Sequence, residues 1–127
     1  MDAVLLARIQ FALTVGFHFL FPPLSIGLAW FIVWVEYRYL ATNQEVYKAM
    51  SRFWIHILGL LFAVGVATGI TMEFQFGTNW AAYSRFVGDI FGAPLAAEGL
   101  FAFFLESTFH GVLLFARGRV SKGVYWA

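Results

Sequence analysis

The chain has 127 residues, which is enough for one domain, but its composition is not that of a soluble one. Hydrophobic residues make up 61% and charged residues 12%, whereas a typical soluble domain has about 45–50% and about 25%. This balance predicts a membrane protein. The net charge of +1 gives no basic excess for nucleic acid, and the lack of cysteine excludes disulfides and thiolate metal sites.

Three stretches are long and apolar enough to cross a membrane, which takes about 20 residues. We therefore expect an all-α membrane protein with transmembrane helices at residues 9–35, 53–75 and 94–116. The start "MDAVLLARIQ" lacks the basic residues and small-residue cleavage site of a signal peptide, so the first stretch is expected to be retained.

Basic residues predict the orientation, because cytoplasmic loops carry an excess of Lys and Arg. Arg8 and Arg85 lie on one side of the predicted spans. The other basic residues lie between the first two spans or after the third: Arg38, Lys48, Arg52, Arg117, Arg119 and Lys122. This distribution predicts that the N-terminus lies outside the cell.

The first span contains a histidine among aromatic residues, in "FHFLFPPLS". Pro22 and Pro23 have no N–H, so the carbonyls of His18 and Phe19 lose their helical hydrogen bonds and the helix should kink. Irregular backbone at this depth is tolerated where it faces protein or a cavity. His18 suits a haem-iron ligand, and a histidine bonded to a carboxylate or a carbonyl remains the alternative.

In the second span, Gly65 and Gly69 are four residues apart and share a helix face. Such spacing lets a partner helix or a flat ligand approach closely, and helix–helix packing is the simpler interpretation. His56, near the cytoplasmic boundary, and Glu73, near the outer end, are explained by interfacial positions.

Two carboxylates lie inside the third span, where ionisable residues are costly and often functional. In a regular α-helix, Glu98 and Glu106 would lie about 80° apart around the axis and about 12 Å apart along it. We expect them to carry protons toward a reaction site; a structural hydrogen bond between helices is the alternative. His110 lies one turn after Glu106, so the two could form a pair. Neither His56 nor His110 is expected to bind a metal.

Two long segments resemble subunit I of the cytochrome bd quinol oxidases. The segment "RIQFALTVGFHFLFPPLSIGLA" is similar to the opening helix of that subunit. The segment "FAVGVATGITMEFQFGTNWAAYSRFVGDIFGAPLAAEGLFAFFLESTF" resembles its second and third helices with the loop between them. The resemblance covers roughly residues 8–116.

The resemblance implies an enzyme that oxidises membrane quinol and reduces O2 to water with three haems: a low-spin b, a high-spin b and a d. His18 matches the axial ligand of a haem in the high-spin pair, b or d. Glu98, in "AAEG", matches a carboxylate at that pair, and Glu106, in "FLEST", matches the acid associated with proton delivery. Arg8 is assigned to a haem propionate. Glu73, in "MEFQFG", matches a carboxylate without an assigned role.

The family subunit is several times longer, so residues 1–127 are expected to be its N-terminal part, the start of a larger helical bundle. The low-spin haem ligands and the quinol loop would lie outside this chain, which alone is expected to be inactive. Implied partners are quinol, O2, the lipid bilayer and a second oxidase subunit, with room for a small single-span subunit, in a bacterial or archaeal plasma membrane. The alternatives are a non-enzymatic haem-binding or scaffold protein, a truncated remnant, and a transporter piece.

Overall fold

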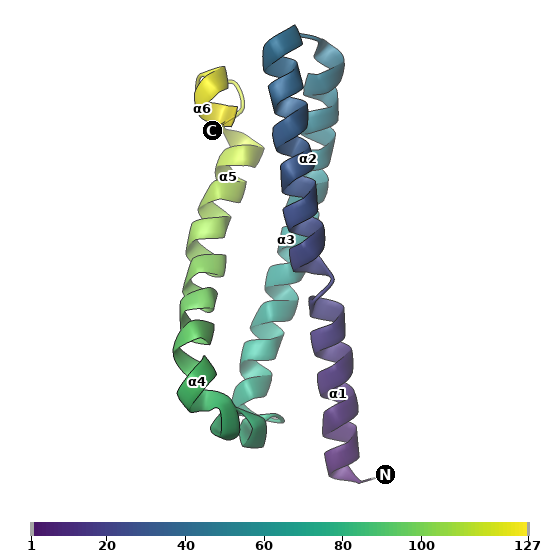
Figure 1. Ribbon diagram of the computed structural model, residues 1–127, viewed down its shortest axis with the longest axis vertical. Helices are drawn as coiled ribbons and strands as arrows, with labels where there is room; N and C mark the ends of the chain where they lie inside the picture. Colours follow the sequence, from purple (N-terminus) through teal and green to yellow (C-terminus); the bar gives the residue numbers. More distant parts are fainter. Residues whose placement is uncertain (1, 127) are drawn as a thin grey trace.

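The computed structural model describes residues 2–126, and within them the secondary structure is entirely helical. The helices form three long rods (Figure 1). The first rod is α1 and α2, the second is α3, and the third is α4, η1 and α5. The bounds are α1 Ala3–His18, α2 Phe21–Thr42, α3 Glu45–Gly77, α4 Ala81–Leu100, η1 Phe101–Glu106, α5 Ser107–Phe115 and α6 Lys122–Trp126.

Each rod is long and apolar enough to cross a membrane, which confirms the predicted class of fold. The first two rods extend beyond the predicted apolar stretches at both ends, whereas the third extends beyond its stretch only at its start. α3, for example, begins at Glu45 and α4 begins at Ala81. Pro94 therefore lies inside α4 rather than at the start of a helix. The orientation with the N-terminus outside stays a prediction.

The first rod is broken at Phe19 and Leu20, directly after His18 (Figure 1). The Phe19 amide still donates to the Val15 carbonyl at 2.9 Å, which closes the last turn of α1. Pro22 and Pro23 fall in the first turn of α2, where a missing N–H costs no helical hydrogen bond. The predicted kink is confirmed, and it takes the form of a complete interruption between two helices.

A tight turn joins α2 to α3, so that these two helices run antiparallel side by side (Figure 1). Asn43 ends α2 in the left-handed conformation, with φ 52° and ψ 21°, and its amide donates to the Tyr39 carbonyl at 2.8 Å. Asparagine is one of the few residues besides glycine that adopts this conformation readily.

Few apolar side chains are buried. Four of them pack together as one cluster: Ile32, Ile55, Leu58 and Tyr125. Most large apolar side chains point outward instead; Phe74 is 72% exposed and Phe86 is 88% exposed. Helices that are apolar all round are typical of segments surrounded by lipid or by further helices.

The third rod changes geometry in its middle. The segment η1, Phe101–Glu106, is a π-helix between two α-helices. Such segments are rare, and they occur frequently at functional sites. The rod packs on α3 through both α4 and α5, and the short helix α6 then turns back onto α2 (Figure 1).

Candidate functional site

His18 is the last residue of α1, and its side chain is held against α3. Its Nδ1 lies 2.8 Å from the hydroxyl oxygen of Thr68. That hydroxyl also lies 3.0 Å from the backbone carbonyls of both Val64 and Gly65. Within residues 2–126, the Nε2 atom of His18 makes no hydrogen bond. One ring nitrogen is therefore anchored, and the other has no hydrogen-bond partner among the described residues.

The glycine face of α3 receives the residues around the helix break. A Cβ atom added at Gly69 would lie 3.2 Å from Cε1 of His18, and one added at Gly65 would lie 3.4 Å from Cβ of Phe21. A real Cβ is seldom this close to a neighbour, so glycine permits the contact at position 69. This confirms the interpretation of Gly65 and Gly69 as a helix-packing face.

A half-open pocket of about 250 Å³ lies beside His18, between α1 and α3. It is lined by Leu13, Thr14, Phe17, Thr68 and Thr71. Three of these side chains carry a hydroxyl group, and the other two are apolar. The pocket wall is therefore partly polar and partly apolar, and it includes Thr68, the residue on α3 that contacts His18.

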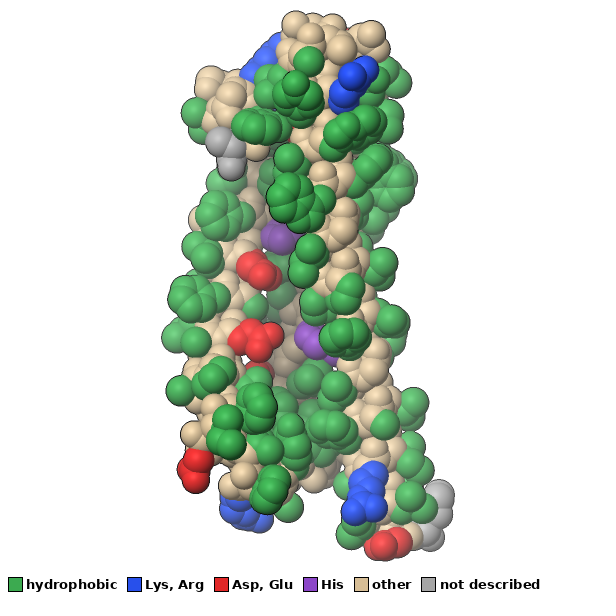
Figure 2. All heavy atoms as spheres, in the orientation of Figure 1, with side chains coloured by type: hydrophobic (Ala, Val, Ile, Leu, Met, Phe, Trp, Pro, Cys, Tyr) green, Lys and Arg blue, Asp and Glu red, His purple; other side chains and the backbone are tan. Residues whose placement is uncertain are grey.

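Glu98 and Glu106 lie on the third rod, and both are exposed in this chain. Figure 2 shows acidic and histidine side chains gathered along the hollow between the first rod and the third rod. In the part of the chain that the structure describes, neither carboxylate has a hydrogen-bond or ion-pair partner. Glu98 and Glu106 are thus unpaired acidic groups on a mostly apolar rod.

The π-helix changes how Glu98 and Glu106 relate to each other. An offset of about 80° holds for a continuous α-helix, but the chain from Phe101 to Glu106 itself is the π-helix η1. A π-helix closes its hydrogen bonds at i→i+5 and turns less per residue. Around the axis of the third rod, the angle between Glu106 and Glu98 is therefore smaller than it would be in a continuous α-helix.

Two other candidates lie away from His18. Arg8 is exposed on α1, ten residues before the histidine, which corresponds to about 15 Å along a helix axis. Glu73 is exposed on α3, one turn beyond Gly69. Neither is brought against the His18 side chain by a contact within residues 2–126.

His110 and His56 both bond to the backbone carbonyl four residues earlier. Nδ1 of His110 lies 2.9 Å from the carbonyl oxygen of Glu106, so the contact of this pair is to the backbone rather than to the carboxylate. The His110 ring stacks on Phe62 at a centroid distance of 4.0 Å. Nδ1 of His56 lies 2.6 Å from the carbonyl oxygen of Arg52. Among residues 2–126, no three His, Asp or Glu side chains form a metal-binding group.

Sequence reasoning missed a buried polar cluster that ties the three rods together. The carboxylate of Glu36 on α2 accepts hydrogen bonds from the Ser51 hydroxyl on α3 and from Arg117, directly after α5. Arg117 also donates to the Ser51 hydroxyl at 2.6 Å. Glu36 directly follows the first apolar stretch, and this position was the one signal that could have marked it.

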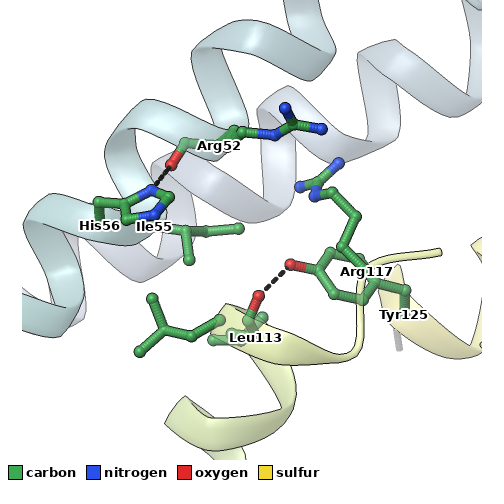
Figure 3. A pocket seen from close by; sticks show the side chains of 7 residues that line it. Arg52, Ile55, His56, Leu113, Arg117 and Tyr125 are labelled. Carbon is green, nitrogen blue, oxygen red and sulfur yellow. Dashed lines mark hydrogen bonds between the residues drawn. The ribbon is translucent and has the colours of Figure 1, made fainter. Parts of the chain in front are cut away.

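A second pocket, of about 210 Å³, opens beside this cluster. It is lined by Arg52, Ile55, His56, Leu113, Leu114, Arg117 and Tyr125 (Figure 3). The Arg117 guanidinium lies 4.7 Å from the centroid of the Tyr125 ring, and the Tyr125 hydroxyl donates to the Leu113 carbonyl. Burial raises the pKa of the Tyr125 hydroxyl, and Arg117 partly opposes this rise. The raised pKa favours the protonated hydroxyl, which is the donor in this hydrogen bond.

These features define an all-helical, multi-pass membrane protein with a histidine presented at a helix break. The model of the family "Cytochrome bd terminal oxidase subunit I" matches residues 6–127, and the chain belongs to this family.

Two curated relatives are similar over nearly the whole chain. Cytochrome bd-II ubiquinol oxidase subunit 1 of Escherichia coli (strain K12) is 56% identical over 121 residues, which are 95% of this chain and 24% of that protein. Cytochrome bd ubiquinol oxidase subunit 1 of Bacillus subtilis (strain 168) is 54% identical over 125 residues, which are 98% of this chain and 27% of that protein. The chain thus spans about a quarter of the length of these relatives.

Proposed function

We propose that this chain is the N-terminal part of a terminal respiratory oxidase that oxidises membrane quinol and reduces O2 to water. Membership of the subunit I family supports the proposal, as do two relatives that are named as ubiquinol oxidase subunits. The activity is proposed for the assembled oxidase, since the chain corresponds to about a quarter of each relative.

Within this function, His18 is proposed as the axial ligand of one haem of the high-spin pair, b or d. The observation that carries the proposal is the anchored Nδ1 and the unpartnered Nε2 of this ring. The residues fit such a group, because a neutral imidazole nitrogen is a common ligand of haem iron and Gly69 leaves space for the ring against α3. When bound, the haem supplies the electron transfer and O2 chemistry; the low-spin haem b is assigned to parts of the oxidase outside this chain.

The carboxylates of Glu98 and Glu106 are proposed to hold and pass protons toward that site. Both are unpartnered within residues 2–126, and both lie on the rod that the π-helix reshapes. Carboxylates inside a membrane frequently form proton relays. Glu98 is also proposed to lie at the high-spin haem pair, and Arg8 to contact a haem propionate.

The partners proposed for the assembled oxidase are quinol, O2, the bilayer and a second oxidase subunit. A small single-span subunit is an additional candidate partner. The oxidase is placed in the inner membrane of a bacterium, with the turn between α2 and α3 facing the cytoplasm. In this orientation, protons for water formation enter from the cytoplasm and quinol protons leave outside. The excess of basic residues at that end of the molecule supports the orientation.

The test is His18→Ala in the full-length oxidase, with the high-spin haem spectrum and O2 consumption as readouts. We expect loss of one high-spin haem signal and of activity. His56→Ala is the control, because that exposed side chain bonds only to the Arg52 carbonyl among residues 2–126. A high-spin spectrum that is unchanged by His18→Ala would contradict the ligand assignment. A stable assembly without haem in the unmutated protein would favour the scaffold alternative.

A further inference from the structure

We propose that Thr68 is a positioning residue for His18: it fixes the imidazole tautomer that keeps Nε2 free of a proton and available to a metal. This inference rests on the proposed function of His18 as a haem ligand. It assigns a role to a side chain on α3, fifty positions away from the histidine.

The argument begins with the single hydrogen of the Thr68 hydroxyl. The hydroxyl oxygen lies 3.0 Å from the carbonyl oxygens of Val64 and Gly65, and a carbonyl can only accept. Threonine in a helix commonly donates to a carbonyl three or four residues earlier. The hydrogen of Thr68 is therefore used on the backbone of α3.

The Thr68 hydroxyl oxygen can then only accept further hydrogen bonds, through its two lone pairs. Nδ1 of His18 lies 2.8 Å from this oxygen, which is a normal hydrogen-bond distance. With the hydroxyl hydrogen already used, the His18 nitrogen must be the donor. The proton of the neutral ring then resides on Nδ1.

A neutral imidazole carries one N–H and one lone pair, so a proton on Nδ1 leaves the lone pair on Nε2. Histidines that bind metals usually donate their other ring N–H to an oxygen, which sets the tautomer and orients the ring. Thr68 supplies that oxygen here. The hydroxyl of Thr68 thus selects which ring nitrogen can bind iron.

The ring is also positioned by shape. Cε1 of His18 would lie only 3.2 Å from a Cβ atom added at Gly69, so a side chain there would crowd the ring. Two consecutive residues of α3 therefore set the position of the His18 ring: Thr68 by a hydrogen bond and Gly69 by a close contact. The same pairing holds the end of α1 against α3 at the helix break.

The chain offers a matched control one turn along α3. Thr71 lines the same pocket as Thr68, and its hydroxyl donates to the Ala67 carbonyl at 2.9 Å. Its hydroxyl makes no contact with His18 among the hydrogen bonds of residues 2–126. Replacing Thr71 therefore reproduces the loss of a helix-bonded threonine hydroxyl without touching the histidine.

The experiment compares Thr68→Val, Thr68→Ser and Thr71→Val in the full-length oxidase. The readouts are high-spin haem content per low-spin haem, the high-spin electron paramagnetic resonance signal, and haem retention on dilution in detergent. Scaling to the low-spin haem corrects for the amount of assembled enzyme. We expect Thr68→Val to weaken haem retention about 10–100-fold, the usual cost of losing such a partner. Thr68→Ser should restore retention, and Thr71→Val should behave as the unmutated protein.

Equal spectra and equal retention in Thr68→Val and Thr71→Val would overturn the inference. If Thr68→Val assembles poorly, Thr68→Ala against Thr71→Ala makes the same comparison with smaller side chains. His18→Ala separates the two proposals. Haem loss in His18→Ala without an effect of Thr68→Val refutes only the role of Thr68, whereas an intact high-spin haem in His18→Ala refutes the ligand assignment itself.

Discussion

Arg117 forms an ion pair with Glu36, although 81 positions separate them in the chain. Both side chains are largely buried, and the Ser51 hydroxyl bonds to both of them. Because Glu36 lies on the first rod, Ser51 on the second and Arg117 at the end of the third, this cluster joins all three rods at one end of the molecule.

Removing either partner of this ion pair is expected to destabilise the protein. Glu36→Ala or Arg117→Ala leaves a buried charge without compensation, which typically costs about 3–5 kcal/mol. The measurement is denaturant unfolding of the purified oxidase in detergent. The control is Glu45→Ala, which breaks the exposed Glu45–Lys48 pair and should cost at most about 1 kcal/mol. Equal effects of Glu36→Ala and Glu45→Ala would contradict the prediction.

Gly69→Ala is expected to disturb the haem ligand. The new methyl group would meet Cε1 of His18 at 3.2 Å, so the ring or helix α1 must shift. The neighbour must give way by a few tenths of an ångström. We expect a changed high-spin haem spectrum. Gly92→Ala is the control, because a Cβ there has no neighbour within 4 Å; the two variants should differ in the spectrum.

Glu106→Gln is expected to slow O2 reduction while leaving haem content unchanged. The amide keeps the size of the side chain but cannot carry a proton at neutral pH, and general acid–base groups contribute about 10²–10⁴-fold to rates. The measurement is O2 consumption with quinol, together with the haem spectrum. Glu73→Gln serves as the comparison, since Glu73 was assigned an interfacial position. A rate in Glu106→Gln equal to that in Glu73→Gln would refute the role in proton transfer.

Stability is expected to fall at alkaline pH through Tyr125. Its pKa is raised above the ordinary value of 10.0 in the folded protein, mainly by burial. Below pH 10, both folded and unfolded states keep the proton and the full stability is present. As the pH rises above 10, the unfolded chain loses its proton first, so the free energy of unfolding decreases.

Tyr125→Phe tests this dependence. It removes the bond to the Leu113 carbonyl, which costs about 0.5–1.5 kcal/mol near neutral pH. It also removes the contribution of Tyr125 to the loss of stability above pH 10. The thermal midpoint should be compared between pH 9 and pH 11 for Tyr125→Phe and for Tyr37→Phe, which alters an exposed tyrosine. An unchanged decline in Tyr125→Phe would show that other groups cause it.

The class of fold was predictable because apolar stretch length and proline position are local signals. Three apolar stretches predicted three rods, and Pro22 and Pro23 predicted the break after His18. The ends of the rods were not predictable in the same way. The helices continue into polar segments such as those beginning at Glu45 and Ala81, where hydropathy no longer marks them.

The candidate site was predictable only in its residue types. His18, Glu98 and Glu106 stand out as ionisable groups in apolar surroundings. Their neighbours do not stand out, because Thr68 lies fifty positions from His18 and its importance depends on how α1 packs on α3. The π-helix that ends at Glu106 has no clear marker in "FAFFLE", which would fit a regular α-helix equally well.

The two helices of the first rod, α1 and α2, differ in how many of their side chains are buried against the rest of the chain. α2 buries four residues, whereas α1 buries none. α1 is therefore held less firmly than α2, although its Phe11 ring packs on Trp80. His18 moves with α1, while Thr68 moves with α3, so any tilting acts directly on the bond between them. A change in the packing around α1 would therefore reach the position of one imidazole ring.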